Sequence, residues 1–428
     1  MAYQTGNSTQ SDKEVVIIGA GIGGLTFALA LHRVGIPCRI YESVSEIKPL
    51  GVGLNLLPHA MKELAGLGLE EQLLAKGRET REYSFFTSHG QLVHREPRGK
   101  FAGYAWPQVS IHRGDLQMTL LQAVHERLGS DVIHLGQRCV RVEQDDGSAT
   151  VYLVDSSTGL ALPSVRAKTV VACDGVHSAI RKQFHPAEAK PRYQGSTQWR
   201  GVTRAKPFMS GASMAYVGTY RTGKLITYPI RDNIDGQGTQ LINWVIEYAK
   251  PEEEERDWNR KGRVEDFIHL FEDCHFDWLD IPKMLRAADA VYEYPMVDQD
   301  PLAFWTVGCV TLLGDAAHPM MPRGSNGAAQ AIIDATILAQ LLATEDDSRS
   351  ALKLYEQKRI KATGDVVLAN REIAPDAILL VVEERTAGKP FDRIEDVISQ
   401  DELQEWQERY KRVAGFDADT LRASGESN

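Results

Sequence analysis

Short apolar runs separated by glycine-rich or polar turns organise the first third of the chain. Glu14-Val-Val-Ile-Ile18 is apolar on both faces of a strand, which is typical of a buried parallel strand. Helical spacing follows over Leu25–Val34, and a second strand pattern over Cys38–Tyr41 ends at Glu42. This order predicts a βαβ unit. Two later runs, Thr150–Val154 and Lys168–Ala172, are predicted as further strands.

The pattern changes between about Gly195 and Lys250, where β-rich segments alternate with turn residues. The predicted strands are Trp199–Thr203, Ser213–Gly218, Leu225–Ile230 and Leu241–Tyr248. Turn pairs such as Thr222-Gly223 and Asp235-Gly236 separate them. We expect a mostly antiparallel sheet, inserted as a separate layer into the α/β unit.

The last third returns to helical spacing. Val307–Leu313 is predicted as one more buried strand, Gly327–Leu342 and Leu352–Asn370 as helices, and Ile394–Val413 as a charged helix. The fold class is therefore α/β: a Rossmann-like nucleotide-binding domain, an inserted antiparallel β-sheet domain and C-terminal helices. The predicted division is 1–13 flexible leader, 14–190 and 290–372 nucleotide-binding domain, 191–289 substrate layer, and 373–428 C-terminal helical segment.

Composition narrows the functional class. The 428 residues include 48 Lys and Arg against 58 Asp and Glu, a net charge of −10, which argues against a nucleic-acid binder. No apolar run approaches the ~18–20 residues of a membrane span. The cysteines have no metal or redox-disulfide spacing, so we expect reduced, mostly buried thiols and no metal site. They are Cys38, Cys139, Cys173, Cys274 and Cys309. The polar N-terminus lacks an apolar signal segment, so a cytoplasmic location is predicted.

Gly19-Ala20-Gly21-Ile22-Gly23-Gly24 fits the pattern G-x-G-x-x-G between the first strand and the first helix. The first glycine permits a tight turn, the second lets a pyrophosphate approach the backbone, and the third allows close packing of helix on strand. Glu42 follows at the end of the next strand, where a carboxylate accepts hydrogen bonds from a ribose. The context predicts a dinucleotide site; the alternative is a glycine-rich turn without a ligand.

Two later strings separate flavin from nicotinamide binding. Residues 171–181 contain Asp174-Gly175 and Arg181, and residues 312–319 read Leu-Leu-Gly314-Asp315-Ala-Ala-His318-Pro319. Each places a carboxylate and several N–H groups at the end of a strand, where they suit sugar hydroxyls and the edge of a flavin ring. The dipeptides Asp-Gly and Gly-Asp are each common in turns. Their order along the chain and their separation make the combination much more specific for a flavin site.

Together these motifs resemble the single-component (group A) FAD-dependent aromatic monooxygenases, which include p-hydroxybenzoate and salicylate hydroxylases. The likeness extends from Val15 to about Asn370. The strongest resemblance is to the phenazine-modifying branch, which converts 5-methylphenazine-1-carboxylate to pyocyanin. The segments that carry it are Glu46–Asn55, Ser110–Met118, Trp199–Thr203 and Tyr294–Pro301.

The resemblance implies non-covalent FAD, NADH or NADPH as co-substrate, and a set of contact residues. The implied cofactor contacts are Gly19, Gly21, Gly23, Gly24, Glu42, Val52, Gly53, Arg113, Gln117, Val140, Asp174, Arg181, Gly314, Asp315, Gly324, Asn326, Gly327 and Ala328. Arg200, Tyr228 and Pro319 are the candidate catalytic residues. The substrate pocket is expected between the flavin and the β-layer, with Leu54, Trp199, Tyr216, Met296 and Met320 in its wall.

The chemistry is therefore assigned to the flavin, since the chain has no HExxH or GxSxG motif. The family uses NAD(P)H and O2 to hydroxylate an aromatic ring through a flavin C4a-hydroperoxide, and a phenazine-, salicylate- or similar carboxylated ring is expected here. Pro319 would lie near the flavin and lacks an N–H. Arg200 could bind a carboxylate, or it could pair with an acid inside the sheet. Tyr228 could donate a hydrogen bond, accept a proton, or merely pack.

Other classes fit less well. A disulfide reductase needs a redox-active CxxxxC motif, and a flavin halogenase needs a Trp-x-Trp-x-Ile-Pro motif. The sequence contains neither motif. A plain NAD dehydrogenase does not need the Gly314-Asp315 loop, and a non-catalytic FAD sensor would not consume NAD(P)H. The main alternative is a flavin epoxidase or Baeyer–Villiger-like oxygenase of secondary metabolism. The sequence does not decide the oligomeric state, which is expected to be a monomer or a homodimer.

Overall fold

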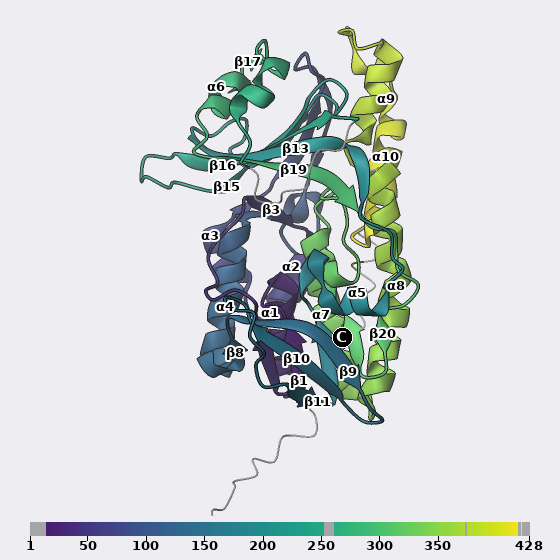
Figure 1. Cartoon of the computed structure of the whole chain (residues 1–428). Helices are drawn as coiled ribbons and strands as arrows, with labels where there is room; N and C mark the ends of the chain where they lie inside the picture. The colour runs from purple at the N-terminus through teal and green to yellow at the C-terminus, as the bar shows by residue number, and fades with distance from the viewer. Residues whose placement is uncertain (1–13, 252–260, 373–374, 418–420, 422–428) are drawn as a thin grey trace, which may run out of the picture.

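The computed structural model describes residues 14–251, 261–372, 375–417 and 421. The predicted leader and the acidic run Glu252–Glu255 lie outside the described residues. Two sheets stand one above the other, with long helices beside both (Figure 1). Segments from both ends of the chain meet where the sheets face each other.

In the described chain, six strands form the lower, mostly parallel sheet. Their order is β20 (Thr306–Val307), β21 (Val310–Leu312), β12 (Thr169–Ala172), β1 (Val15–Ile18), β2 (Cys38–Tyr41) and β8 (Ile133–His134). β1 lies between β12 and β2, and all three are parallel. β1 and β12 are buried throughout, as their continuous apolar runs predict.

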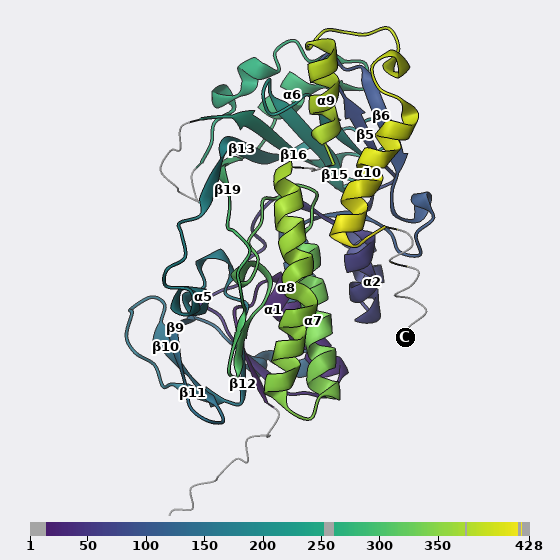
Figure 2. The same cartoon turned by 90° about the vertical axis from the view of Figure 1, so that its right-hand side faces the viewer.

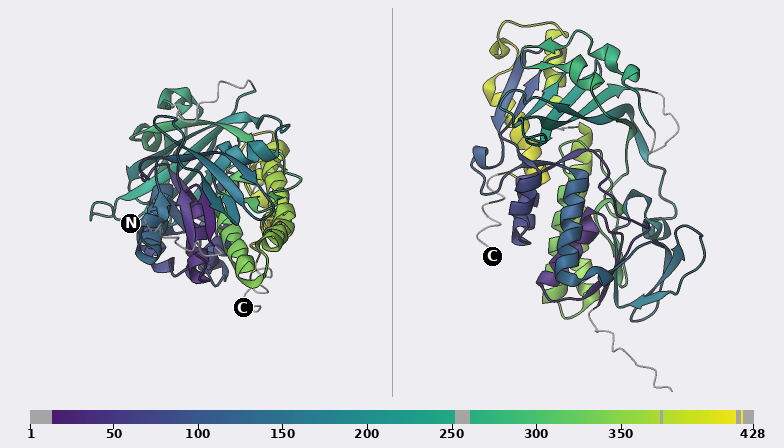
Figure 3. Two further views of the ribbon diagram at one scale, coloured as in Figure 1. Left: turned by 60° about the horizontal axis from the view of Figure 1, so that its bottom comes forward. Right: turned by 90° about the vertical axis from the view of Figure 1, so that its left-hand side faces the viewer.

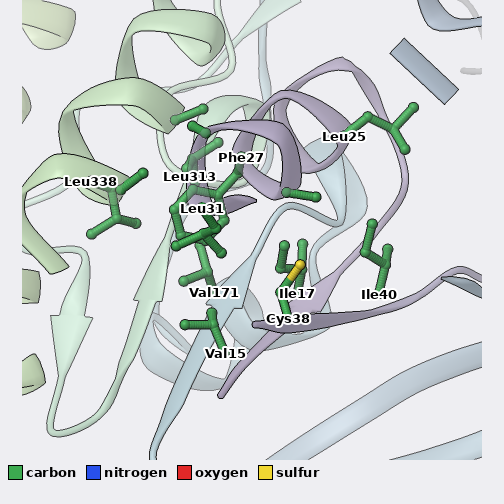
Figure 4. Close-up of a cluster of buried hydrophobic side chains, with 14 of the residues drawn as sticks. Val15, Ile17, Leu25, Phe27, Leu31, Cys38, Ile40, Val171, Leu313 and Leu338 are labelled. Carbon is green, nitrogen blue, oxygen red and sulfur yellow. The ribbon is translucent and has the colours of Figure 1, made fainter. Parts of the chain in front are cut away.

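Helices cover this sheet and complete the main core. They are α1 (Ile22–Arg33), α4 (Arg113–Leu128), α7 (Gly327–Thr344) and α8 (Ser348–Glu372). α1 packs against α4 and α7, and α7 against α8 (Figure 2). Figure 4 shows the core between them, where Ile17 of β1, Phe27 of α1 and Leu338 of α7 are buried. All five cysteines are free, and Cys38, Cys139 and Cys309 are buried, as expected of reduced thiols.

One of these helices, α7, is long and apolar enough to cross a membrane by length and composition. In the structure, 61% of this stretch is buried against the rest of the protein, so its apolar character is that of a core helix.

Within the described residues, seven strands form the upper sheet. Their order is β19 (Val291–Asp298), β13 (Arg192–Ala205), β16 (Gln240–Ala249), β15 (Lys224–Arg231), β14 (Ser213–Val217), β5 (Glu82–Phe86) and β6 (Leu92–Pro97). All pairings are antiparallel except β14 with β5. The sheet thus extends beyond the predicted layer of residues 191–289, because β5, β6 and β19 join it. The division into domains stays a prediction.

Two predicted elements are broken in the structure. The expected strand Val307–Leu313 is a tight hairpin of β20 and β21, since Gly308 adopts a left-handed φ of 58° between them. The expected helix Ile394–Val413 is a short 3₁₀ turn, Ile394–Asp396, followed by α10 (Gln400–Ala414). Ser399 caps α10, since its side chain accepts a hydrogen bond from the Glu402 N–H.

The C-terminal helices connect the two sheets. α9 (Ala377–Thr386) packs on the upper sheet, and α10 contacts α8 (Figure 2). Smaller elements complete the fold (Figure 3): β3 (Gly53–Leu56), β4 (Arg78–Glu79), β7 (Val109–His112), β9 (Gln137–Gln144), β10 (Ala149–Asp155), β11 (Val165–Ala167), β17 (His275–Phe276), β18 (Leu279–Asp280), α2 (Pro58–Gly66), α3 (Glu70–Lys76), α5 (Ala179–Phe184) and α6 (Ile281–Arg286).

Candidate active site

A cavity of about 370 Å³ lies between the two sheets. Residues from both contribute to its wall, so the glycine-rich turn and the upper sheet face one continuous space. From the predicted set, the lining residues are Gly21, Gly23, Gly53, Leu54, Arg113, Arg200, Tyr216, Tyr228, Gly314, Asp315, Met320, Gly324, Asn326, Gly327 and Ala328. This is the volume range of ligand sites.

The glycines of the first motif are required by packing. A side chain on Gly19, whose φ is 101°, would place its Cβ 2.4 Å from the carbonyl oxygen of Cys173. A Cβ on Gly24 would lie 2.0 Å from the Gly19 oxygen. Gly21 is different, because no atom lies within 4 Å of its added Cβ. The turn is therefore tight on the protein side and open at the one glycine expected to meet a pyrophosphate.

Glu42 and Gln117 hold this turn from two sides. The Ala20 N–H donates to Glu42 Oε2 at 2.7 Å, and Gln117 Nε2 donates to the Ala20 carbonyl at 3.0 Å. Neither side chain belongs to the cavity wall, whereas Arg113 does. Both residues are thus close to the predicted nucleotide site, as expected, and in this structure they fix its backbone.

Asp174 leaves a buried acceptor unused. Its Oδ2 accepts the Ala179 N–H at 3.0 Å, but its Oδ1 is buried and has no hydrogen-bond partner among the described residues. Burial raises the pKa of this carboxyl group. Unpaired buried acceptors are costly, so a donor from a ligand, such as a sugar hydroxyl, fits here.

Arg181 corrects the sequence analysis. Its guanidinium is buried, donates to the carbonyls of Ala316 and Ala317 at 3.0 and 2.9 Å, and pairs with Glu188. It does not line the cavity. Arg181 therefore supports the loop after Gly314 from behind, where a cofactor contact was expected.

The Gly314-Asp315 loop is anchored by an acid that the motifs did not reveal. Asp334 of α7 accepts the Gly314 N–H at 3.2 Å, pairs with His318 Nε2 at 2.6 Å, and with Arg359 Nε at 2.7 Å. Burial opposes its charge, but His318 and Arg359 lower the pKa of Asp334 to about 2. Asp315 itself lines the cavity, and burial raises its pKa.

The loop that carries Gly324 and Asn326 is braced by the C-terminal helix. Gly324 has a φ of 65°, and an added Cβ would lie 1.7 Å from the hydroxyl oxygen of Tyr410 in α10. Asn326 Nδ2 donates to that hydroxyl at 2.8 Å, and the hydroxyl donates to Asn370 Oδ1 at 2.7 Å. Asn326 occupies the N-cap position of α7 without a side-chain capping bond, and Gly327, the first residue of the helix, also lines the cavity. Tyr410 was missed because no motif marks the C-terminal segment.

The upper sheet presents three rows of side chains to the cavity. Strand register places Lys224 opposite Glu247, Ile226 opposite Val245, and Tyr228 opposite Asn243. The rows are charged, apolar and polar respectively. Successive rows are two residues apart on each strand, which is about 7 Å.

Arg200 lies beside the apolar row, since it pairs with Val245 in register. It donates to Gln198 Oε1 at 3.1 and 2.6 Å, and its guanidinium lies 5.5 Å from the Tyr294 ring. Among the described residues no carboxylate lies within ion-pair distance of it. Burial lowers the pKa of Arg200. The alternative that it pairs with an acid inside the sheet is therefore wrong.

Tyr228 lies in the polar row, close to Asn55 and Asn243, and burial raises its pKa. Asn243 also accepts the Gly53 N–H at 2.7 Å, which ties strand β3 to the upper sheet. Tyr216 lines the cavity and stacks on Phe85 with ring centroids 4.8 Å apart. Neither asparagine is among the predicted site residues.

Of the predicted contacts not yet described, five do not line the cavity. Trp199 faces the opposite side of β13 and packs on Phe267, because side chains alternate along a strand. The others are Val52, Val140, Met296 and Pro319. Val140 is exposed in a bulge of β9, while Val52, Met296 and Pro319 are buried outside the wall. Within the described ranges, no group of His, Cys, Asp and Glu is placed to hold a metal ion.

Comparisons with known proteins agree with this geometry. The family described as "FAD binding domain" matches residues 12–369. The phenazine 1,6-dicarboxylic acid hydroxylase PhzS of Lysobacter antibioticus is 42% identical over 85% of this chain and 91% of its own. The 3-hydroxybenzoate 6-hydroxylase of Polaromonas naphthalenivorans (strain CJ2) is 31% identical over 85% and 88%.

Solved structures share the fold. Klebsiella pneumoniae HpxO, complexed with FAD and uric acid, has a TM-score of 0.71 at 23% identity, covering 96% of this chain and 97% of its own. A salicylate hydroxylase substrate complex has a TM-score of 0.70 at 22% identity, covering 95% and 99%.

Fold, motifs and comparisons define a flavoprotein monooxygenase. The chain belongs to the FAD binding domain family, as a group A FAD-dependent aromatic monooxygenase that uses NAD(P)H and O2. The residues present fit FAD, because Gly21 opens onto free space and Asp174 offers an unused acceptor. Gly21, Asp174, Asp315 and the loop around Asn326 would hold it.

Proposed function

We propose that the enzyme hydroxylates a small aromatic ring that carries a carboxylate, of the phenazine or salicylate type. The observation that carries this is Arg200, a cation in the cavity wall with no carboxylate partner among the described residues. Arg200 is half-buried, and placing a guanidinium without an ion-pair partner there is costly, so an anionic substrate would stabilise it. The named activity of the Lysobacter relative, on a phenazine dicarboxylic acid, supports the same class.

The wall suits a flat ring. Ile226 and Val245 form an apolar platform, with Tyr216 and Met320 also facing the space. A ring on this platform would place a carboxylate near Arg200. Apolar contact on this face also excludes water, which protects the oxygen-transfer step.

Tyr228 would orient the ring through a hydrogen bond. Because its pKa is raised, its hydroxyl stays protonated near neutral pH and donates to a substrate oxygen. The neighbouring Asn55 and Asn243 lie close to that hydroxyl. When bound, FAD would supply the redox chemistry of the reaction, with NAD(P)H as the reductant and O2 as the source of the oxygen atom.

The test combines binding, turnover and labelling. Purified enzyme with FAD is given a panel of aromatic acids, phenazines and uncharged analogues under ¹⁸O₂, with NADH or NADPH. We expect an aromatic acid to stimulate NAD(P)H oxidation and to gain one labelled oxygen on the ring. Label only in water or peroxide would contradict a monooxygenase role for that compound. Ring expansion or an epoxide would favour the alternative oxygenase chemistry. We further propose a cytoplasmic enzyme, monomeric or homodimeric.

A further inference from the structure

Four charged side chains form a cluster at the substrate end of the cavity. Lys224 Nζ lies 2.5 Å from Glu247 Oε2 and 2.6 Å from Asp376 Oδ2, and Arg323 Nη2 lies 2.5 Å from Glu247 Oε1. The Lys224 side chain is 3% exposed and that of Glu247 is fully buried. All except Glu247 belong to the cavity wall. The cluster therefore sets the charge that a substrate meets there.

The cluster is electrically balanced, with two cations and two carboxylates. Burial opposes the charge on Glu247, but Lys224 and Arg323 hold its pKa well below the usual range. Burial likewise opposes the charge on Lys224, but Asp376 and Glu247 raise its pKa. Glu247, Lys224 and Arg323 thus remain ionised near neutral pH. Arg200, one row away, is the cation of the upper-sheet wall that has no carboxylate partner among the described residues.

Asp376 is held in place by α9, the helix that it precedes. On that helix Glu383 accepts a hydrogen bond from the Thr219 hydroxyl at 2.7 Å, and Glu384 pairs with Arg221 at 2.8 Å. Thr219 and Arg221 belong to the turn between β14 and β15, which leads directly into Lys224. The same turn thus positions both members of the Lys224–Asp376 pair.

We propose that Asp376 is a specificity-determining residue that makes this pocket favour aromatic monoanions, in contrast to the dicarboxylic acid for which the Lysobacter relative is named. It cancels the charge with which Lys224 would otherwise attract a second carboxylate. This inference rests on the proposed function, in which Arg200 binds the first carboxylate. Without Asp376, the upper-sheet wall would offer two uncompensated positive charges, at Arg200 and Lys224; with it, this wall offers one. A second carboxylate would instead meet the Asp376 carboxylate, which has the same sign and lines the wall.

The experiment compares three ligands that share one ring and differ in the number of carboxylates that it carries. Uncharged, monocarboxylate and dicarboxylate forms of one ring, phenazine or naphthalene, are titrated into the FAD-loaded enzyme at pH 7.5. Binding is followed by the change in flavin absorbance. We expect the monocarboxylate to bind at least tenfold more tightly than either other form.

The variant Asp376→Asn should then raise affinity for the dicarboxylate roughly tenfold or more, since one unit charge is removed from a partly buried site. Affinity for the monocarboxylate should change much less. Glu384→Gln is the matched control, because it removes the same charge from the same helix at an exposed pair with Arg221. It should keep the wild-type preference.

Two results would overturn the inference: tighter binding of the dicarboxylate by the wild type, or an unchanged preference in Asp376→Asn. The wild-type comparison decides alone if the variant does not fold. Failure of the proposed function looks different. In that case no aromatic acid binds or stimulates NAD(P)H oxidation in the wild type.

Discussion

Replacing Gly324 by Ala tests whether the C-terminal helix braces the flavin loop. Two costs arise. An alanine held at a φ of 65° loses about 1–2 kcal/mol. Its Cβ would also lie 1.7 Å from the Tyr410 hydroxyl oxygen, so that ring must move and give up its hydrogen bonds to Asn326 and Asn370. Those two bonds are together worth about 1–3 kcal/mol.

The matched control is Gly388→Ala. Gly388 has a similar φ of 70°, but no atom lies within 4 Å of an added Cβ. It should show the backbone cost alone, with FAD affinity unchanged. Gly324→Ala should lose a further ~1–3 kcal/mol of stability, and if the displaced loop holds FAD, its affinity falls about 5- to 150-fold.

Thermal unfolding and titration of the apoprotein with FAD measure the two effects separately. Equal behaviour of the two variants in both assays would refute the brace. A loss of stability in Gly324→Ala without any loss of FAD affinity would show that Tyr410 supports the fold and not the cofactor loop.

Three further predictions concern single side chains. Asp315→Ala removes a cavity carboxylate and should weaken FAD binding by roughly 1.5–3 kcal/mol, measured by FAD retained after dialysis; unchanged retention would contradict the assigned role. Arg200→Ala and Tyr228→Phe should keep FAD but raise the ratio of peroxide to hydroxylated product, while a wild-type ratio would leave both as packing residues. His59 is buried with a pKa lowered to about 3, so the native state resists the proton that the unfolded chain takes up below about pH 6.5. His59 therefore reduces stability as the pH falls from 7.5 to 5, and His59→Gln should abolish about 2 kcal/mol of that loss in urea titrations. The same substitution at the exposed His89 should not.

Local patterns were enough to predict the nucleotide-binding half. Strands β1 and β12 are mostly apolar because both of their faces are buried, and the G-x-G-x-x-G turn needs only neighbouring residues. The four central strands of the upper sheet were also predicted. Their order in the sheet, and the addition of β5 and β6, depend on pairings between distant segments, which periodicity does not reveal.

Side-chain direction was the weaker part of the site prediction. Placing both Trp199 and Arg200 in the pocket wall is impossible for neighbours on one strand, since they face opposite sides. The structure assigns the cavity side to Arg200. Asp376 and Tyr410 could not be predicted, because they reach the site only through the packing of α9 and α10. Charge balance at Lys224 is likewise a property of four segments together.

The brace by Tyr410 also has a consequence for biosynthesis. Gly21 and Tyr410 are 389 positions apart in the chain. At ~5–20 residues per second, a ribosome makes Tyr410 roughly 20–80 s after the glycine-rich turn. During that interval the nascent chain has the nucleotide turn but lacks the side chain that fixes the Asn326 loop. Full retention of FAD therefore has to follow synthesis of α10, and ribosome-bound chains stalled before α10 should bind FAD only weakly.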